Sequence, residues 1–274
     1  MKSLSKKLAP LFLSVTASCL TMSPVSAQSA VTWDTDECGS NPSLLTDACT
    51  ATPSRYEVTI YEMGLCQTNP LLGTNFDASK CVTTATSSTG LTEDLAGGAT
   101  YTLTEATQTR PSNGVYPYAY LVVGSEFGLR GSYQVNGVTF TSTGVVSSGN
   151  GLVQSGGTAT NFQATLDEFN IDADSCASEF TANNIHGGTI YARLTDANLI
   201  TADQTGAGTG SCPGRPRAIG VFEPGSPINI TDSTTALQVQ FVTTDTGMTV
   251  IPDDTGVPDT FTMGPLMTVF TVIN

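Results

Sequence analysis

Two Asp-Thr-Gly triplets, Asp245-Thr246-Gly247 and Asp254-Thr255-Gly256, are the residues that most directly suggest chemistry. In aspartic proteases such triplets supply two carboxylates that share a proton. Those two aspartates come from different lobes or subunits, and each follows an apolar strand. Here the triplets start nine residues apart, and the second follows Pro252-Asp253 rather than an apolar strand. We therefore interpret both as turns, where Asp and Gly are favoured.

A run of carboxylates suggests a second chemistry, the binding of Ca²⁺. Asp167, Glu168, Asp172 and Asp174 lie within one short segment, and Ca²⁺ takes roughly six to eight oxygen ligands. The segment lacks the central glycine and the closing glutamate of an EF-hand loop. The sequence predicts these four residues as a candidate Ca²⁺ site, with a solvated acidic loop as the alternative. It indicates no other cofactor.

Other catalytic signatures are absent from the sequence. The one histidine, His186, precedes Gly187-Gly188 and is typical of a turn. There is no Gly-x-Ser-x-Gly elbow and no phosphate, dinucleotide, zinc or haem motif. Two carboxylates could hydrolyse a glycoside, but 24 acidic residues give no basis for choosing a pair. We predict that the protein is not an enzyme, and keep a paired-carboxylate hydrolase as an alternative.

Three tyrosines could instead bind sugar. Tyr116, Tyr118 and Tyr120 fall on one face of a predicted strand over residues 116–123. Such a strip could stack against a glycan or pack against other strands. Because large aromatic side chains are mostly buried, we favour packing.

The N-terminus has the layout of a secretory signal peptide. Three lysines precede an apolar stretch over residues 8–20, and Val25 and Ala27 provide the small residues before a cut. We predict cleavage after Ala27 and a secreted or cell-surface protein. Lipidation at Cys19, within Thr16-Ala17-Ser18-Cys19, is the alternative. No later segment reaches the roughly 20 apolar residues of a membrane helix, so we expect no direct membrane insertion.

The charge balance limits the partners. Cleavage removes Lys2, Lys6 and Lys7, which leaves seven basic residues against 24 acidic ones, a net charge of −17. Such a chain repels nucleic acid and anionic membranes, and its charge keeps it soluble. We expect no nucleic-acid partner.

Cysteine content indicates an oxidising compartment. Cleavage removes Cys19 and leaves six cysteines, an even number that favours disulfides in an exported chain. Pairing of neighbours would close short or medium loops. We predict the bonds Cys38–Cys49, Cys66–Cys81 and Cys176–Cys212.

The elements that must position these residues are strands. Candidate helices are scarce, and apolar residues alternate in 55–62, 133–140 and 236–242. The fold class is all-β, an antiparallel β-sandwich with one large or two smaller units. We divide the chain into a signal peptide (1–27), a polar segment (28–54), a sandwich domain (55–150) and a second unit or continuation of the same sandwich (151–274).

Further strands are expected near residues 95–103, 161–166, 188–194 and 265–273. Asn136-Gly137 is typical of a tight hairpin turn because both residues tolerate positive φ angles. We also expect Met248–Ile251 to pair back on Ala236–Val242 as a hairpin.

The motifs Tyr56–Glu62 and Leu95–Tyr101, within residues 55–140, give a weak resemblance. A strand, a disulfide and an acidic turn are followed by Leu-x-x-Gly-x-x-Tyr before an apolar strand. This order resembles exported prealbumin-like and immunoglobulin-like β-sandwich modules of bacterial surfaces. The resemblance implies a sandwich and says nothing about activity.

Together these features predict an exported structural subunit of a cell-surface or extracellular assembly, such as a filament, coat or adhesin layer. Its partners would be further copies of itself or other surface components. The alternative is a Ca²⁺-assisted carbohydrate-binding module, whose partner would be a glycan.

Overall fold

The computed structural model describes residues 31–32, 36–96, 106–169, 176–185, 187–201, 212 and 214–274. Within these ranges the chain forms 19 strands and one short 3₁₀ helix, η1 (Ala78–Lys80). The predicted all-β fold with mostly antiparallel pairing is confirmed. No helix among the described residues is long and apolar enough to cross a membrane.

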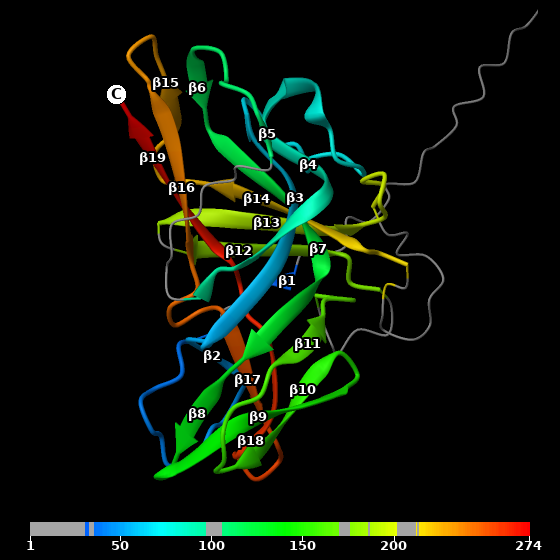
Figure 1. The fold of residues 1–274 in the computed structure, drawn as a ribbon, viewed down its shortest axis with the longest axis vertical. Helices are drawn as coiled ribbons and strands as arrows, with labels where there is room; N and C mark the ends of the chain where they lie inside the picture. Colours follow the sequence, from blue (N-terminus) through cyan, green and yellow to red (C-terminus); the bar gives the residue numbers. More distant parts are fainter. Residues whose placement is uncertain are drawn as a thin grey trace, which may run out of the picture.

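A nine-stranded sheet forms the larger, upper part of the molecule (Figure 1). Its strands, in spatial order, are β1 (Val31–Thr32), β12 (Glu179–Ile185), β13 (Gly188–Thr195), β14 (Arg217–Glu223), β7 (Tyr118–Arg130), β3 (Arg55–Cys66), β4 (Cys81–Asp94) and β5 (Thr107–Gln108), with β11 (Phe162–Thr165) also paired to β7. β7 is central, and its apolar run is buried on both faces, as a strand covered on both sides requires. β1 pairs with β12 in parallel and is only two residues long.

A six-stranded, barrel-like sheet forms the lower part. Its strands are β2 (Cys49–Ala51), β17 (Met248–Pro252), β18 (Pro258–Met263), β10 (Asn150–Ser155), β9 (Val138–Ser147) and β8 (Ser132–Val135). The two sheets share one apolar core, in which Leu129, Phe162, Met248 and Phe261 are almost fully buried. The lower sheet is therefore packed onto the upper one.

Two further strand pairs cover one face of the upper sheet. They are β6 (Gly114–Tyr116) with β15 (Ile228–Ile230), and β16 (Ala236–Val242) with β19 (Met267–Ile273). Ile228, Phe270 and Val272 pack there against Ala119 of β7. On the opposite face, Tyr120 and Val122 pack against Leu71 and Phe76 of the loop between β3 and β4. The upper part is thus a sandwich, as the sequence predicts.

The three predicted disulfides are all present: Cys38–Cys49, Cys66–Cys81 and Cys176–Cys212. Cys66 and Cys81 are register partners at the end of the β3–β4 pair, so their bond closes the loop that covers the upper sheet. Three disulfides in one chain are typical of an extracellular protein. The predicted signal peptide lies outside the described residues.

The predicted Asn136-Gly137 hairpin is confirmed between β8 and β9, with positive φ at both residues. The expected pairing of Met248–Ile251 with Ala236–Val242 is wrong. β17 pairs with β18 and β2, whereas β16 pairs with β19. The turn between them, in which Asp245 has φ of 59°, carries the chain from the upper sandwich to the lower sheet instead of folding it back.

The strands of residues 55–150 and 151–274 alternate within both large sheets. β14 lies between β13 and β7, and β18 lies between β17 and β10. Of the strand expected over residues 95–103, only residues 95 and 96 are described, and the rest lies outside the described residues. The division of the chain near residue 150 stays a prediction.

Candidate docking groove

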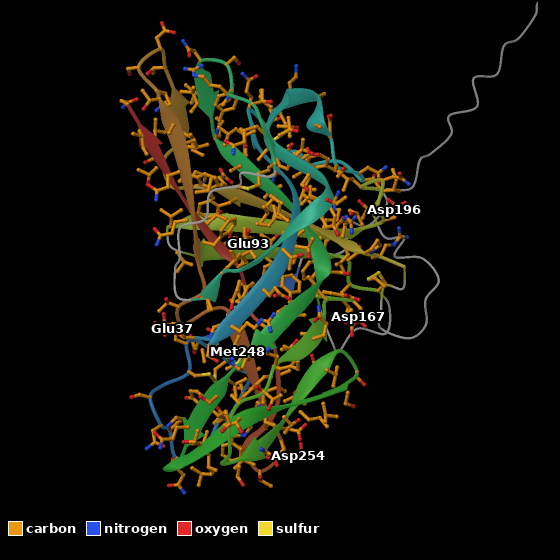
Figure 2. The ribbon with its side chains drawn as sticks, viewed as in Figure 1. Glu37, Glu93, Asp167, Asp196, Met248 and Asp254 are labelled. Atoms are coloured by element: carbon orange, nitrogen blue, oxygen red, sulfur yellow. A yellow bond between two sulfur atoms is a disulfide. The ribbon has the colours of Figure 1, made fainter. Side chains whose placement is uncertain are left out.

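The candidate catalytic and metal-binding residues of the sequence are dispersed over the molecule. Figure 2 shows Asp167 beside the upper sheet and Asp254 at the lower end. Both Asp-Thr-Gly triplets form turns, one at each end of β17. Asp245 accepts a hydrogen bond from Thr52 Oγ1 at 3.0 Å. Asp253, just before the second triplet, accepts hydrogen bonds from the Thr255 hydroxyl and from the backbone N–H groups of Val257 and Thr255, and these bonds lower its pKa. The predicted turn interpretation is confirmed.

Half of the predicted Ca²⁺ site can be placed. Asp167 and Glu168 follow β11, whereas Asp172 and Asp174 lie outside the described residues. Burial, aided by the neighbouring Asp167, raises the pKa of Glu168. No group of three or more metal-ligating side chains occurs among the described residues. The Ca²⁺ site therefore stays a prediction, and His186 also lies outside the described part.

The three tyrosines do not form one strip, because Pro117 separates β6 from β7. Tyr116 is buried in the cluster beneath β15, whereas Tyr118 and Tyr120 pack on the opposite face of the upper sheet. The expected single face is wrong for Tyr116, and the favoured packing role is confirmed for Tyr116 and Tyr120, which are both buried.

Two tyrosines of the upper sheet, Tyr120 and Tyr191, form hydrogen bonds with carboxylates. Tyr120 donates to Glu62. Tyr191 of β13 donates to Glu223 at 3.0 Å. Burial and the Glu223 carboxylate raise the pKa of Tyr191 to about 12. These contacts stabilise the sheet face and leave no open ring for a sugar at Tyr120.

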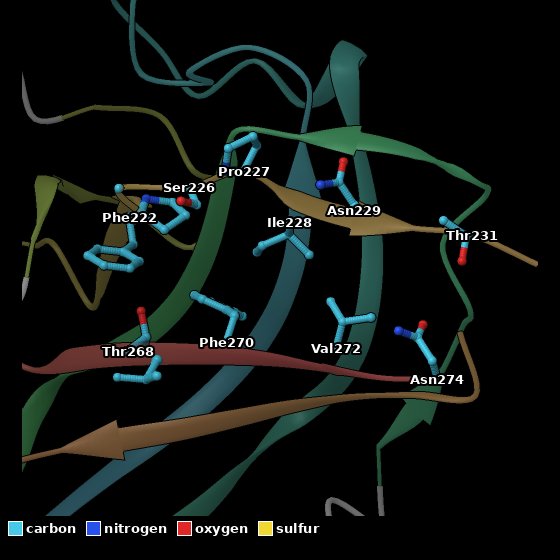
Figure 3. Close-up of a pocket in the computed structure, with 13 residues that line it drawn as sticks. Phe222, Ser226, Pro227, Ile228, Asn229, Thr231, Thr268, Phe270, Val272 and Asn274 are labelled. Atoms are coloured by element: carbon cyan, nitrogen blue, oxygen red, sulfur yellow. The ribbon is translucent and has the colours of Figure 1, made fainter. Parts of the chain in front are cut away.

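The feature best built for binding was not predicted: a groove in the second layer of the upper sandwich (Figure 3). The layer runs β6, β15, β19 and β16. Among the described residues β15 pairs only with β6, and β19 pairs only with β16, although β15 and β19 lie close to each other. The groove lies along these two strand pairs, where Ile228, Phe270 and Val272 pack together.

Sequence alternation within β19 explains the floor of the groove. Phe270 and Val272 point inward and are half-buried, while Val269 and Ile273 point outward and are 38% and 43% exposed. Phe222 of β14 lies beneath, with its ring stacked 6.2 Å from that of Phe270. These side chains form an apolar floor for the groove.

One end of the groove is closed by the turn that joins β15 to β16. Ser233 and Thr234 donate hydrogen bonds from their hydroxyls to the side-chain oxygen of Asn274. Thr235 N–H donates to the carbonyl oxygen of Ile273 at 2.7 Å. Because backbone groups alternate between the two edges of a strand, this bond leaves the N–H and C=O groups of Phe270 and Val272 on the edge of β19 that does not pair with β16.

The groove has a volume of about 520 Å³ and carries no acidic, basic or histidine side chain among its described lining residues. These residues are Phe222, Pro224, Gly225, Ser226, Pro227, Ile228, Asn229, Thr231, Thr268, Val269, Phe270, Val272 and Asn274. In a chain with a net charge of −14, an uncharged hollow is a local exception. An uncharged, apolar floor suits an apolar surface of a partner better than a charged small molecule.

A larger hollow of about 720 Å³ lies on the opposite side, where the Arg217 guanidinium stacks 3.4 Å above the ring of Tyr61. Its wall includes Cys212 and Gly214, which border positions 211 and 213, outside the described residues. Its shape therefore does not define a site.

Comparisons with protein-family models, curated protein sequences and solved structures find no match to this chain. The resemblance to bacterial surface modules thus stays a prediction, and the functional argument depends on the groove.

Sequence reasoning missed the groove because it depends on strand pairing. The alternation of Phe270 and Val272 was visible in the predicted final strand. That β19 would pair on one edge only, with β15 facing the other, was not visible.

Proposed function

We propose that the protein is a secreted structural subunit whose copies assemble through the groove beside β15 and β19. The observation that carries this proposal is the uncharged, apolar floor of the groove in a chain with a net charge of −14. The floor residues Phe270 and Val272 are half-buried, and an apolar segment of another copy that covers them would remove them from water.

Contact through the groove would supply both affinity and specificity. Burial of the apolar floor would provide the affinity, and the uncharged lining would select an apolar segment of the next copy. The contact is heterologous, since a groove on one copy receives a different surface of the next. Heterologous contacts build open filaments when the rotation between copies does not close a ring. This property suits the filament or coat that composition suggests.

Composition supports a role outside the cell. Three disulfides constrain the chain, and the strong negative charge would repel copies except where the uncharged groove lets them meet. The proposal includes no catalytic activity.

The test compares two substitutions on neighbouring residues of β19. Val272→Lys places a charge on the groove floor, whereas Ile273→Lys places the same charge on the outward face. The chain beginning at Gln28 and both variants are concentrated and then measured by light scattering and electron microscopy. We expect assembly of the unmodified chain and of Ile273→Lys, and monomers for Val272→Lys.

Thermal unfolding of both variants is the folding control. A chain that stays monomeric at high concentration would refute the proposed function. Equal assembly of Val272→Lys and Ile273→Lys would refute the role of the groove.

A further inference from the structure

We propose that the group entering the groove is the side chain of Leu72 from a neighbouring copy. This inference rests on the proposed function and names the partner segment. Leu72 lies in the loop that joins β3 to η1. We call residues 67–76 the cover loop, because they pack on the face of the upper sheet opposite the groove. Copies would thus stack with the cover loop of one against the groove of the next.

The width of the groove admits a side chain but not a strand. Neighbouring strands lie about 4.8 Å apart, so an inserted strand needs about 9.5 Å between its two neighbours. β15 and β19 have Cα atoms within 8 Å of each other. Figure 3 shows Ile228, Phe270 and Val272 directed into the space between these strands, where they form the floor of the hollow. An apolar side chain on a protruding loop suits such a hollow.

Leu72 protrudes further than any other large apolar side chain among the described residues, with 80% of it exposed. Leu71, the residue before it, is buried and anchors the cover loop on the sheet together with Phe76. A single exposed leucine is ordinary on a protein surface. What distinguishes Leu72 is how firmly its backbone is held.

The cover loop is fixed on both sides of Leu72. The Arg193 guanidinium donates to the backbone carbonyl oxygen of the residue before Leu72 and to those of the two residues after it. Thr201 Oγ1 donates to the carbonyl oxygen of Thr74 at 2.6 Å, and the disulfide Cys66–Cys81 closes the loop. Because a fixed conformation reduces the entropy lost on binding, the loop presents Leu72 ready for a contact.

The cover loop and the groove are both uncharged. Residues 67–76 include no acidic or basic side chain, and the described lining of the groove includes none. The chain is otherwise strongly acidic, so copies repel each other wherever acidic surfaces approach. These two uncharged surfaces are therefore places where copies can meet with little repulsion.

The positions of the loop and the groove predict an open stack. In Figure 1, β15 and β19 lie at the left of the upper sheet. Figure 2 has the same view and shows Asp196 at the right, in the turn that contacts the cover loop through Thr201. Each copy thus presents a groove on one side and Leu72 on the other, and its own loop cannot reach its own groove. A heterologous contact of this kind adds copies in a line.

The first test compares the same substitution at two exposed leucines. Leu72→Lys charges the proposed contact, whereas Leu44→Lys charges a leucine that is 57% exposed. Leu44 lies at the lower end of the molecule, because the N–H of Leu45 donates to the carbonyl oxygen of Gly256. The chain beginning at Gln28 and both variants are measured by light scattering over a range of concentrations, and thermal unfolding verifies that each variant folds.

We expect Leu72→Lys to raise the concentration needed for assembly about tenfold or more, because burying a leucine side chain is worth about one to two factors of ten in affinity. Leu44→Lys should stay within about twofold, since salt screens exposed charges. Lysine makes the acidic chain less negative, so a loss of assembly does not come from added repulsion between whole copies.

A mixture of two variants tests whether the two surfaces are partners. Leu72→Lys keeps an intact groove and Val272→Lys keeps an intact cover loop, so each alone should be monomeric. Together they can form one intact contact, while the other contact would bring two lysines together. We expect a one-to-one dimer and no larger species in analytical ultracentrifugation. A mixture that stays monomeric would overturn the inference.

The two proposals fail in different ways. If Val272→Lys blocks assembly while Leu72→Lys assembles as Leu44→Lys does, the groove receives another segment and only the inference fails. If the unmodified chain from Gln28 stays monomeric at high concentration, the proposed function fails.

Discussion

Replacing Arg193 by alanine should release the loop that covers the upper sheet. Arg193 lies on β13 and is 6% exposed. Its guanidinium donates to the carbonyl oxygens of Gly73 at 2.6 Å, Thr74 at 3.0 Å and Leu71 at 3.1 Å. It also forms an ion pair with Glu179 at 2.8 Å. Burial lowers the pKa of Arg193, an effect that the Glu179 carboxylate opposes.

The expected loss of stability follows from these contacts. Hydrogen bonds to a charged group contribute about 1.5–3 kcal/mol each. Gly73 and Thr74 are exposed, so water can replace the guanidinium there, whereas Leu71 is buried. The disulfide Cys66–Cys81 keeps the loop tethered. We therefore expect Arg193→Ala to cost about 2–4 kcal/mol, mainly from the charged hydrogen bond to the buried Leu71 carbonyl, with at most about 1 kcal/mol from the Glu179 pair. For a chain of this size that lowers Tm by roughly 4–16 °C.

Thermal and denaturant unfolding measure this loss, and two variants separate its causes. Glu179→Gln removes the ion pair alone. Because the Glu179 side chain is 35% exposed, it should cost at most about 1 kcal/mol. Arg193→Lys keeps the charge, but lysine lacks the planar guanidinium fork that reaches three carbonyl oxygens. The lysine variant should therefore resemble alanine more than arginine. A loss below about 1 kcal/mol for Arg193→Ala would refute the reasoning.

Two further predictions concern a turn and a tyrosine. Gly137→Ala should destabilise the fold by about 1–2 kcal/mol because φ is +77° there. Gly220→Ala, at an equally open site without positive φ, should be close to neutral. Denaturant unfolding measures both costs, and equal costs would contradict this explanation. Tyr191 should titrate near pH 12 in ultraviolet absorbance, so the stability that its raised pKa confers is complete below pH 10 and falls as pH rises to about 12. Glu223→Gln should lower that pKa, and an unchanged titration would exclude the carboxylate as a cause.

Local patterns in the sequence were sufficient to predict many strands, one hairpin and the disulfides. The alternation in Tyr56, Val58 and Ile60 identified a strand that buries those three side chains. Asn136-Gly137 identified a hairpin because positive φ is needed at both positions. The disulfides followed from neighbour pairing, since each bond closes a loop of 11 to 36 residues. These features depend on residues that are close in sequence.

Features that depend on distant pairing could not be predicted. β16 and β17 were each identified as strands, but nothing in either sequence shows that β16 pairs with β19 and β17 with β18. The groove results from this choice of partners. The tyrosine strip was wrong for a similar reason. β6 ends at Tyr116 and β7 begins at Tyr118, and the alternation of residues alone does not reveal this change of strand at Pro117.

The pairing of distant strands also sets the order in which the molecule can be completed. β2 meets β17 across almost 200 residues, and the Tyr56 hydroxyl donates to the carbonyl of Gly264 across 208 residues. Such long-range contacts make folding slow, because the chain entropy is lost before the contacts form. β19, which borders the groove, follows every strand of the upper sheet in the sequence. The groove can therefore form only after the strands that lie beneath it have been synthesised.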